Sequence, residues 1–270
     1  TTLQSVYAVP VGKVCLKKNR PLCSLIMTQA EEDTFVIHIS ISHIIADGYT
    51  AYAILNMLLV PDSITAMDPQ RDQSFNHKLQ KALGPKEKSL LDFSLPGILN
   101  AIGKFLFLPR PKGYFFKINM EAVEEEKKSY QVQGTDSNFV STNDILSSTL
   151  ARMMHFTSLY MAINFRRRLT FTTSANKESK GEMLAGNYES GILFFEGDFV
   201  QPQQIRLAQG KATPGLYQRP VNTAGALSPI PGFWKRTFGR PGIITNWAGW
   251  DANFVLPNCE PLLFVPLNGL

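Results

Sequence analysis

The stretch that decides the fold reads Ile39-Ser40-Ile41-Ser42-His43-Ile44-Ile45-Ala46-Asp47-Gly48. Before it, apolar and more polar residues alternate over Thr34–Ser42, a period of two that is typical of a β-strand with one apolar face on a core. After it, Tyr49–Leu59 is rich in Ala, Leu and Met and predicts a buried helix. The chain therefore runs from a strand through a tight turn into a helix, an arrangement that holds a reactive group from both sides.

His43, Asp47 and Gly48 form an H-x-x-x-D-G pattern in this turn. The chain has four histidines, and composition alone would produce such a match in about one comparable sequence in a hundred. A histidine at the end of a strand is also often a purely structural residue. Spacing alone therefore leaves both interpretations open, a catalytic histidine and a structural one.

Hydrophobic periodicity and turn residues predict further elements along the chain. Strands are expected at Ser5–Val11, Ser24–Gln29 (paired with Thr34–Ser42), Leu159–Arg166, Gly191–Phe195 and Ile243–Trp247. A polar helix is expected at Glu121–Ser129, and a second helix begins after Ser141, which forms a capping-box pattern with Asp144. Loops or weak helix are expected over Pro61–Lys88, and a long loop over Pro202–Pro241.

The composition predicts a folded protein. The 270 residues are 44% apolar, 11% aromatic and 18% charged, which leaves ample apolar surface to bury and excludes disorder as the main state. The net charge of +5 indicates a mild attraction to anionic partners without naming one, and small molecules such as a phosphorylated cofactor or a CoA thioester fit it. Because no basic stripe interleaved with aromatic residues is present, nucleic-acid binding is not expected.

The cysteines and histidines do not predict a metal site. Cys15, Cys23 and Cys259 have no C-x-x-C spacing, and none of the four histidines lies at ligand spacing from them. Reduced intracellular thiols are therefore expected.

The most apolar stretches, Ile98–Leu108 and Ala51–Val60, are too short to span a bilayer. The apolar segment Leu90–Leu108, broken by Pro96 and Gly97, could lie on a membrane surface, line an apolar pocket or form a core or lid helix.

The segment Ile39–Gly48, with the helix after it, resembles the catalytic segment of the chloramphenicol-acetyltransferase-like (CAT-like) superfamily. This superfamily includes the BAHD acyltransferases of plants and fungi, wax ester synthases and the condensation domains of peptide synthetases. Three later segments resemble BAHD features in the family order: the helix start at Ser141–Ser148, the strand Asn164–Leu169 followed by Gly186-Asn187, and Thr245-Asn246-Trp247. The resemblance spans most of the chain and is nearest to the BAHD enzymes.

The chain also departs from the family patterns. BAHD enzymes carry D-F-G-W-G after the Thr245–Trp247 strand, whereas Trp250–Pro257 lacks those glycines. Ser42 stands where condensation domains and wax ester synthases usually have a second histidine. Family members are considerably longer, and the chain starts at Thr1, so we expect it to be incomplete at one or both ends.

The resemblance implies an α/β (α+β) fold of two CAT-like domains, 1–130 and 131–270. Each would be a mixed sheet flanked by helices, with the active site at their interface. The implied reaction moves an acyl group from acyl-CoA, a co-substrate and not a resident cofactor, to a hydroxyl or amine of a small-molecule acceptor. His43 would be the general base, since an imidazole titrates near neutral pH.

The other site residues follow from the same resemblance. Asp47 would turn away from the imidazole and pair with Arg166 or Arg168, and Gly48 would let the backbone turn sharply into the helix. Asn246 or Trp247 could donate to the oxyanion or line a tunnel, although both could equally end a structural strand. Arg166–Arg168 could attract phosphates or remain exposed charge.

A second interpretation of the same residues is a catalytically silent CAT-like protein that serves as a binding or assembly subunit of a larger complex. The altered C-terminal motif and the apparently missing segments favour it. Nothing at the start of the chain resembles a secretory signal, so an intracellular location, in the cytoplasm or an organelle, is expected in either case.

Overall fold

The structure is a computed structural model, which describes Val9 and residues 18–59, 64–83, 99–100, 103, 116–131, 139–175, 177–208 and 230–246. The chain divides into two compact units, each made of segments that are distant in sequence. Unit 1 comprises Thr1–Gln73, Thr170–Glu189 and Trp247–Leu270, and unit 2 comprises Ser74–Leu169 and Ser190–Asn246. The predicted domains, 1–130 and 131–270, are contiguous instead, and that division stays a prediction.

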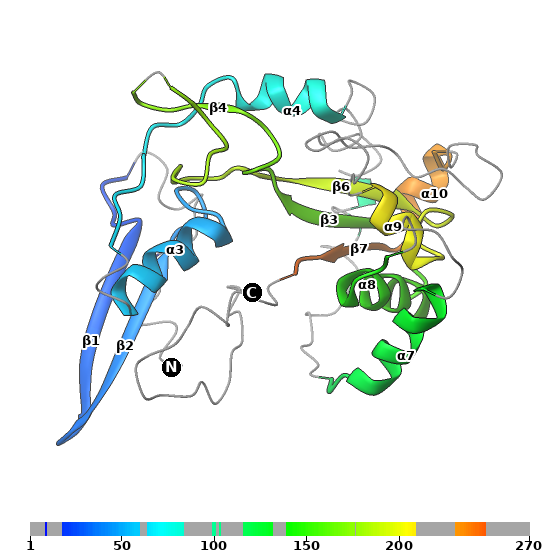
Figure 1. Cartoon of the computed structure of the whole chain (residues 1–270), viewed down its shortest axis with the longest axis horizontal. Coiled ribbons are helices and arrows are strands. Elements are labelled where there is room, and N and C mark those ends of the chain that lie inside the picture. Colours follow the sequence, from blue (N-terminus) through cyan, green and yellow to red (C-terminus); the bar gives the residue numbers. More distant parts are fainter. Residues whose placement is uncertain are drawn as a thin grey trace. The chain divides into compact units, whose positions relative to one another are not determined.

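Unit 1 begins its described part with a hairpin of two antiparallel strands, β1 (Cys23–Glu31) and β2 (Thr34–Ile41) (Figure 1). Leu25 lies opposite Ile39, and the register shifts near the turn, after Gln29. The predicted strand pair is confirmed, with both strands within two residues of their expected bounds.

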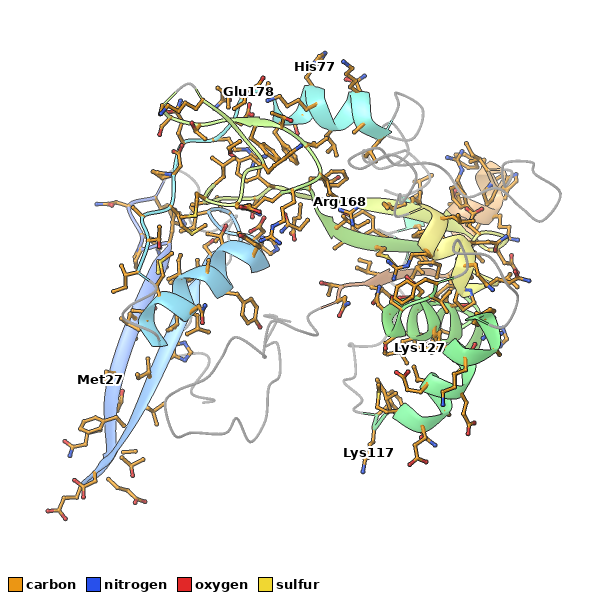
Figure 2. The ribbon with its side chains drawn as sticks, in the orientation of Figure 1. Met27, His77, Lys117, Lys127, Arg168 and Glu178 are labelled. Carbon is orange, nitrogen blue, oxygen red and sulfur yellow. The ribbon has the colours of Figure 1, made fainter. Side chains whose placement is uncertain are left out.

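The apolar face of this hairpin is exposed over its outer half. Met27, Phe35 and Ile37 share that face and are 68%, 54% and 57% exposed (Met27 is labelled in Figure 2). The expectation that the apolar face lies on a core is therefore wrong for this part of the hairpin. Alternation fixes which side chains share a face, but it does not determine what packs against that face.

The remaining elements of unit 1 surround a small aromatic core. Helix α3 (Gly48–Leu59) confirms the predicted helix, although its residues are mostly half-buried and not fully buried as expected. Two short strands, β4 (Phe171–Thr172) and β5 (Glu178–Ser179), pair antiparallel. The rings of Phe171 and Tyr188 are fully buried and pack edge to face with their centroids 5.0 Å apart. A parallel bridge between Asp68 and Leu184 joins the segment after α3 to this core.

Unit 2 contains a three-stranded sheet in the order β6 (Glu189–Phe195), β3 (Ser158–Asn164) and β7 (Pro241–Ile244). Strands β3 and β7 are parallel, and β6 starts with the last residue of the 170–189 segment of unit 1. The first two strands confirm the predictions. The third begins two residues earlier than expected and ends at Ile244, and Trp247 lies outside the described residues.

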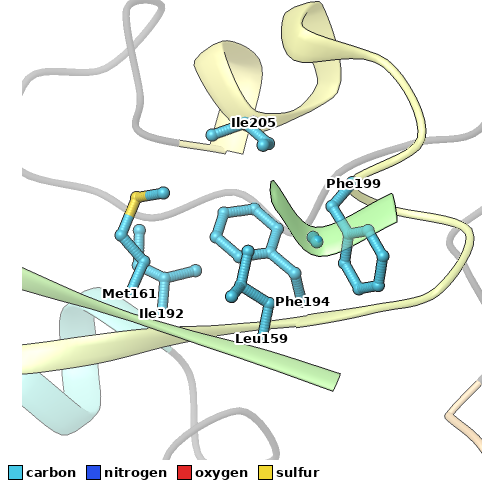
Figure 3. Packing of buried hydrophobic residues seen from close by; sticks show 7 residues of the cluster. Leu159, Met161, Ile192, Phe194, Phe199 and Ile205 are labelled. Atoms are coloured by element: carbon cyan, nitrogen blue, oxygen red, sulfur yellow. The ribbon is translucent and has the colours of Figure 1, made fainter. Parts of the chain in front are cut away.

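The core of unit 2 lies between this sheet and the helices α8 (Thr142–Met153) and α9 (Pro202–Ala208). Its buried members, most of them labelled in Figure 3, are Ala151, Leu159, Met161, Ile192, Phe194, Phe199 and Ile205. Helix α9 and a further helix, α10 (Phe233–Phe238), interrupt the loop predicted over Pro202–Pro241. Tertiary burial of Ile205 stabilises α9, whose seven residues, beginning with a proline, do not predict a helix.

Two other helices were predicted in part. Helix α7 (Met120–Gln131) confirms the polar helix, and α4 (Phe75–Leu83) is the weak helix within Pro61–Lys88, with one face buried.

Most of Leu90–Leu108 lies outside the described residues, as does all of the predicted strand Ser5–Val11 except Val9. Within the described ranges, none of the helices is long and apolar enough to cross a bilayer. The fold is of the mixed α/β class, with small sheets and flanking helices.

Candidate active site

The turn that carries His43 begins where strand β2 ends. The N–H of Ser42 donates to the carbonyl of Leu22 (2.7 Å), and the N–H of Ile45 donates back to the carbonyl of Ser42 (3.0 Å). Ser42 itself is buried, whereas the side chain of His43 is 72% exposed. The strand end thus fixes the backbone on one side of His43 and leaves its imidazole accessible.

On the other side of the turn, Asp47 caps helix α3. Its Oδ1 accepts from the N–H of Thr50 (3.0 Å), and its carbonyl accepts the first helical bond, from Ala51 (3.0 Å). An aspartate at this position satisfies N–H groups that have no partner within the helix. Gly48 is the first residue of α3, so the motif marks where the helix starts.

A second segment of unit 1, Gly186–Glu189, docks on this turn. Asp47 bonds to it twice: its Oδ2 accepts from the N–H of Tyr188 (2.9 Å), and its N–H donates to the carbonyl of Gly186 (3.3 Å). The hydroxyl of Thr50 donates to the carbonyl of Gly186 (3.0 Å) and accepts from its N–H (3.1 Å). Gly186 has φ of +124°, a conformation that only glycine adopts without strain.

Asn187 binds the turn beside the histidine. Its side-chain N–H₂ donates to the carbonyls of His43 (2.6 Å) and Ile44 (3.1 Å). Arg71 supports this segment from behind, since its guanidinium donates to the Asn187 carbonyl and lies 4.6 Å over the ring of Tyr188. The backbone that presents His43 is therefore held by a partner 144 residues away in sequence.

The carboxylate of Glu189 contacts the imidazole ring of His43. Its Oε1 lies 3.2 Å from Nε2 of His43, and a third of the Glu189 side chain is exposed. The hydrogen bond from the ring to this carboxylate is the main cause that raises the pKa of His43 to about 9, although partial desolvation acts to lower it. The charge of Glu189, a bond to the histidine's own backbone and the Asn187 side chain act in the same direction as the main cause.

This pKa means that the histidine is mostly an imidazolium in the resting protein. At pH 7 only about 1% of a group with a pKa of 9 is neutral. A base that is charged at rest becomes effective when its carboxylate partner is displaced or neutralised, or when the pH rises. Among the described residues, no group of three or more His, Cys, Asp and Glu side chains is placed to hold a metal ion.

Several predicted site residues lie in unit 2 or outside the described ranges. Asn164 Oδ1 accepts from the N–H (3.0 Å) and the guanidinium (3.3 Å) of Arg166. The pKa of Arg168 is lowered mainly by burial of its guanidinium and to a smaller extent by the positive charge of Arg206. The pairing of Asp47 with Arg166 or Arg168 stays a prediction, as do the roles of Asn246 and of Trp247, which is not among the described residues.

The sequence predicts no role for Glu189 or for the side chain of Asn187. The only available signal was position, because Glu189 follows two residues after the Gly186-Asn187 pair and starts a strand. Thr50 was also missed, since a threonine in a helix has no recognisable long-range partner in sequence. All three contacts join segments more than 130 residues apart.

Comparisons with known proteins add little to this geometry. No protein-family model matches the sequence, and no curated protein matches it. One solved structure with some likeness is described as "Crystal structures of the first condensation domain of the CDA synthetase", with 11% sequence identity and a TM-score of 0.35. The match covers 81% of this chain and 53% of that one, so the chain spans about half its length. A TM-score this low carries no inference about activity.

Proposed function

We propose that this chain is an acyltransferase that moves an acyl group from a thioester, acyl-CoA, to a hydroxyl or amine acceptor. The observation that carries the proposal is an exposed imidazole on a turn held from both sides. Strand β2 and the capped start of α3 hold it along the chain, and Gly186–Glu189 holds it across the unit. A structural histidine would not need its ring exposed while its backbone is held so closely.

In this mechanism Nε2 of His43 takes the proton of the acceptor as the nucleophile attacks the thioester carbonyl. The carbon–sulfur bond then breaks, and the proton passes from His43 to the leaving thiolate. No acyl-enzyme forms, because both substrates meet at the same imidazole and most of the rate arises from positioning. Asn246 or Trp247 would donate to the oxyanion. Within Arg166–Arg168, Arg167 is exposed and would attract the CoA phosphates, whereas Arg166 is buried.

The charge state of His43 adds a condition to this mechanism. The folded protein holds the pKa of His43 at about 9. While the pH is below that value, each increase of one pH unit raises the fraction of neutral His43 roughly tenfold. Turnover limited by the free base should therefore increase with pH through the neutral range and level off near pH 9.

The test is release of free thiol from acetyl- to long-chain acyl-CoA in the presence of mixed alcohols and amines. His43→Ala should lower the rate by about 100- to 10,000-fold, the usual contribution of a general base. His77→Ala is the matched control, because His77 is an exposed histidine on α4 (Figure 2), and it should leave the rate unchanged. Both variants should melt within a few degrees of the parent.

Thiol release that survives in His43→Ala would contradict the assignment of the base. No release from the parent protein with any donor would contradict the acyltransferase itself.

One observation favours the silent binding or assembly subunit as a second candidate function. The outer half of the β1–β2 hairpin exposes Leu25, Met27, Phe35 and Ile37 on one face, and contiguous exposed apolar surface marks interaction sites in many proteins. This candidate predicts no thiol release, together with a stable complex that Met27→Lys or Ile37→Lys abolishes in size-exclusion chromatography. A monomer that releases thiol would contradict it.

A further inference from the structure

The carboxylate of Glu189 is not needed for simple base catalysis by His43. It lies 3.2 Å from Nε2, the atom that must accept the proton of the substrate. In the resting site the Glu189 carboxylate instead accepts a hydrogen bond from Nε2 of His43, so this nitrogen is not available to a substrate. Both side chains are accessible, with 72% of His43 and 33% of Glu189 exposed, so a ligand can reach the gap between them.

We propose that Glu189 binds the acceptor as a protonated primary amine, and that this contact makes the site selective for amines over alcohols. The inference rests on the proposed acyltransferase function and names its acceptor class. An acceptor atom within hydrogen-bond distance of Nε2 must lie close to the Glu189 carboxylate, since the two protein atoms are themselves in contact. An ammonium group carries the positive charge that the imidazolium supplies at rest, whereas a hydroxyl does not.

Two other charged groups near the His43 turn, Asp47 and Arg71, are engaged in holding the backbone. Asp47 accepts from the N–H groups of Thr50 and Tyr188, and it is 2% exposed. Arg71 donates to the carbonyl of Asn187 and packs on the ring of Tyr188. Glu189 is therefore the accessible negative charge beside Nε2 within the described part of this site.

The steps balance in atoms and charge. When the ammonium binds Glu189, the second positive charge drives one proton from His43 to solvent. Neutral His43 then takes a proton from the ammonium, and the freed amine attacks the thioester carbonyl to form the carbon–nitrogen bond. The carbon–sulfur bond breaks, His43 returns its proton to the thiolate, and the remaining excess proton on nitrogen leaves through Glu189 to water. When the product leaves, His43 regains one proton from solvent and is again the imidazolium of the resting site. The products are an amide, a thiol and one proton.

The first experiment compares a primary amine with the alcohol of the same carbon skeleton, such as phenethylamine and 2-phenylethanol, with acetyl-CoA as donor. Glu189→Gln should lower the ratio of kcat/KM for the amine to that for the alcohol by about 10- to 100-fold, the usual contribution of one hydrogen bond to a charged group. Glu178→Gln, which removes an exposed carboxylate on β5 of the same unit, should leave the ratio unchanged. Glu189→Asp keeps the charge and should restore part of it.

An unchanged ratio in Glu189→Gln would overturn the proposal, as would a parent protein that prefers the alcohol. These outcomes differ from failure of the proposed function, in which no acceptor supports thiol release that depends on His43.

The second experiment does not require turnover. The His43 ring is titrated by NMR with and without millimolar propylammonium or propanol. Propylammonium should shift the His43 titration to lower pH in the parent protein and have no effect in Glu189→Gln, and propanol should have no effect in either. Absence of the propylammonium shift in the parent protein would overturn amine binding at Glu189, whatever the acyl-transfer assay shows.

Discussion

Asp47 and Asp144 are two buried aspartates at the start of two helices, one in each unit. Asp47 is 2% exposed and Asp144 is fully buried, and each bonds to N–H groups where its helix begins. They differ in how their oxygens are used. The Oδ2 of Asp144 accepts from the N–H and hydroxyl of Ser141 and from Arg206, whereas Asp47 gives one oxygen to Thr50 and the other to Tyr188.

Asp144 acts as a local helix cap, whereas Asp47 acts as a clamp, by which we mean a side chain that joins a helix start to a segment distant in sequence. The capping box of Asp144 is complete within four residues, and its ion pair with Arg206 is added to a helix start that is already defined. Asp47 instead joins the helix after the His43 turn to a segment 141 residues away. Loss of the first should weaken a unit, and loss of the second should also displace the candidate site.

The largest expected difference comes from replacing each aspartate by asparagine. An amide has one acceptor oxygen, so Asp144→Asn can keep the Oδ2 contacts with Ser141 and loses mainly the charge, at a cost of about 1–2 kcal/mol. Asp47→Asn must turn its N–H₂ toward a buried N–H donor, at a cost of about 2–4 kcal/mol. Chemical denaturation of both variants measures the two costs.

The same variants distinguish the two roles by activity. Thiol release should fall in Asp47→Asn well below what its lost stability explains, and it should remain near the parent rate in Asp144→Asn. Equal costs in stability and equal rates would remove the distinction between cap and clamp.

A smaller effect is expected at Thr50, which supports the clamp with its hydroxyl. Thr50→Val preserves shape but leaves the N–H and carbonyl of Gly186 without the hydroxyl, at a cost of about 1–2 kcal/mol. Thr149→Val in α8 is the matched control, because Thr149 is also in a helix and its hydroxyl accepts a hydrogen bond from Arg152, three residues away, at 3.3 Å. A stability loss in the control as large as that in Thr50→Val would show that helix propensity, and not the contact with Gly186, causes the effect.

The smallest effect is the pH dependence of the stability of unit 1. The folded state raises the pKa of His43 from 6.5 to about 9, so protonation stabilises the fold fully below pH 6.5 and this contribution is lost as the pH rises through 9. Because 72% of the His43 side chain and 33% of the Glu189 side chain are exposed to solvent, the change should be small. Hydrogen exchange between pH 6.5 and 9 should show the loss at residues 43–50 in the parent protein and not in Glu189→Gln. An equal loss in that variant would contradict the His43–Glu189 pair as its source.

Much of the local structure was predictable. The alternation over Thr34–Ser42 and the turn before it gave the β1–β2 hairpin, and the Ala/Leu-rich segment after Gly48 gave α3. Ser141 and Asp144 gave the start of α8 because the reciprocal bonds of a capping box lie within four residues. Helix α9 was missed, since seven residues beginning with proline have little intrinsic preference and its stability comes from the burial of Ile205.

The candidate site was predictable only at the turn itself. The spacing of His43, Asp47 and Gly48 pointed to a held histidine, because a strand, a turn and a helix start follow one another in sequence. Asn187 and Glu189 could not be given their contacts, since hydrogen bonds over more than 140 residues leave no periodicity or local pattern.

The sequence by itself determined the elements whose interactions are local: the hairpin, helix α3, the capped start of α8 and the position of His43 at the end of a strand. The tertiary structure alone decided what stands beside that histidine. It placed a carboxylate 3.2 Å from Nε2 and thereby made the imidazole a cation at neutral pH. The physical reason is that a pKa is set by distance and charge in space, whereas a sequence pattern records only distance along the chain.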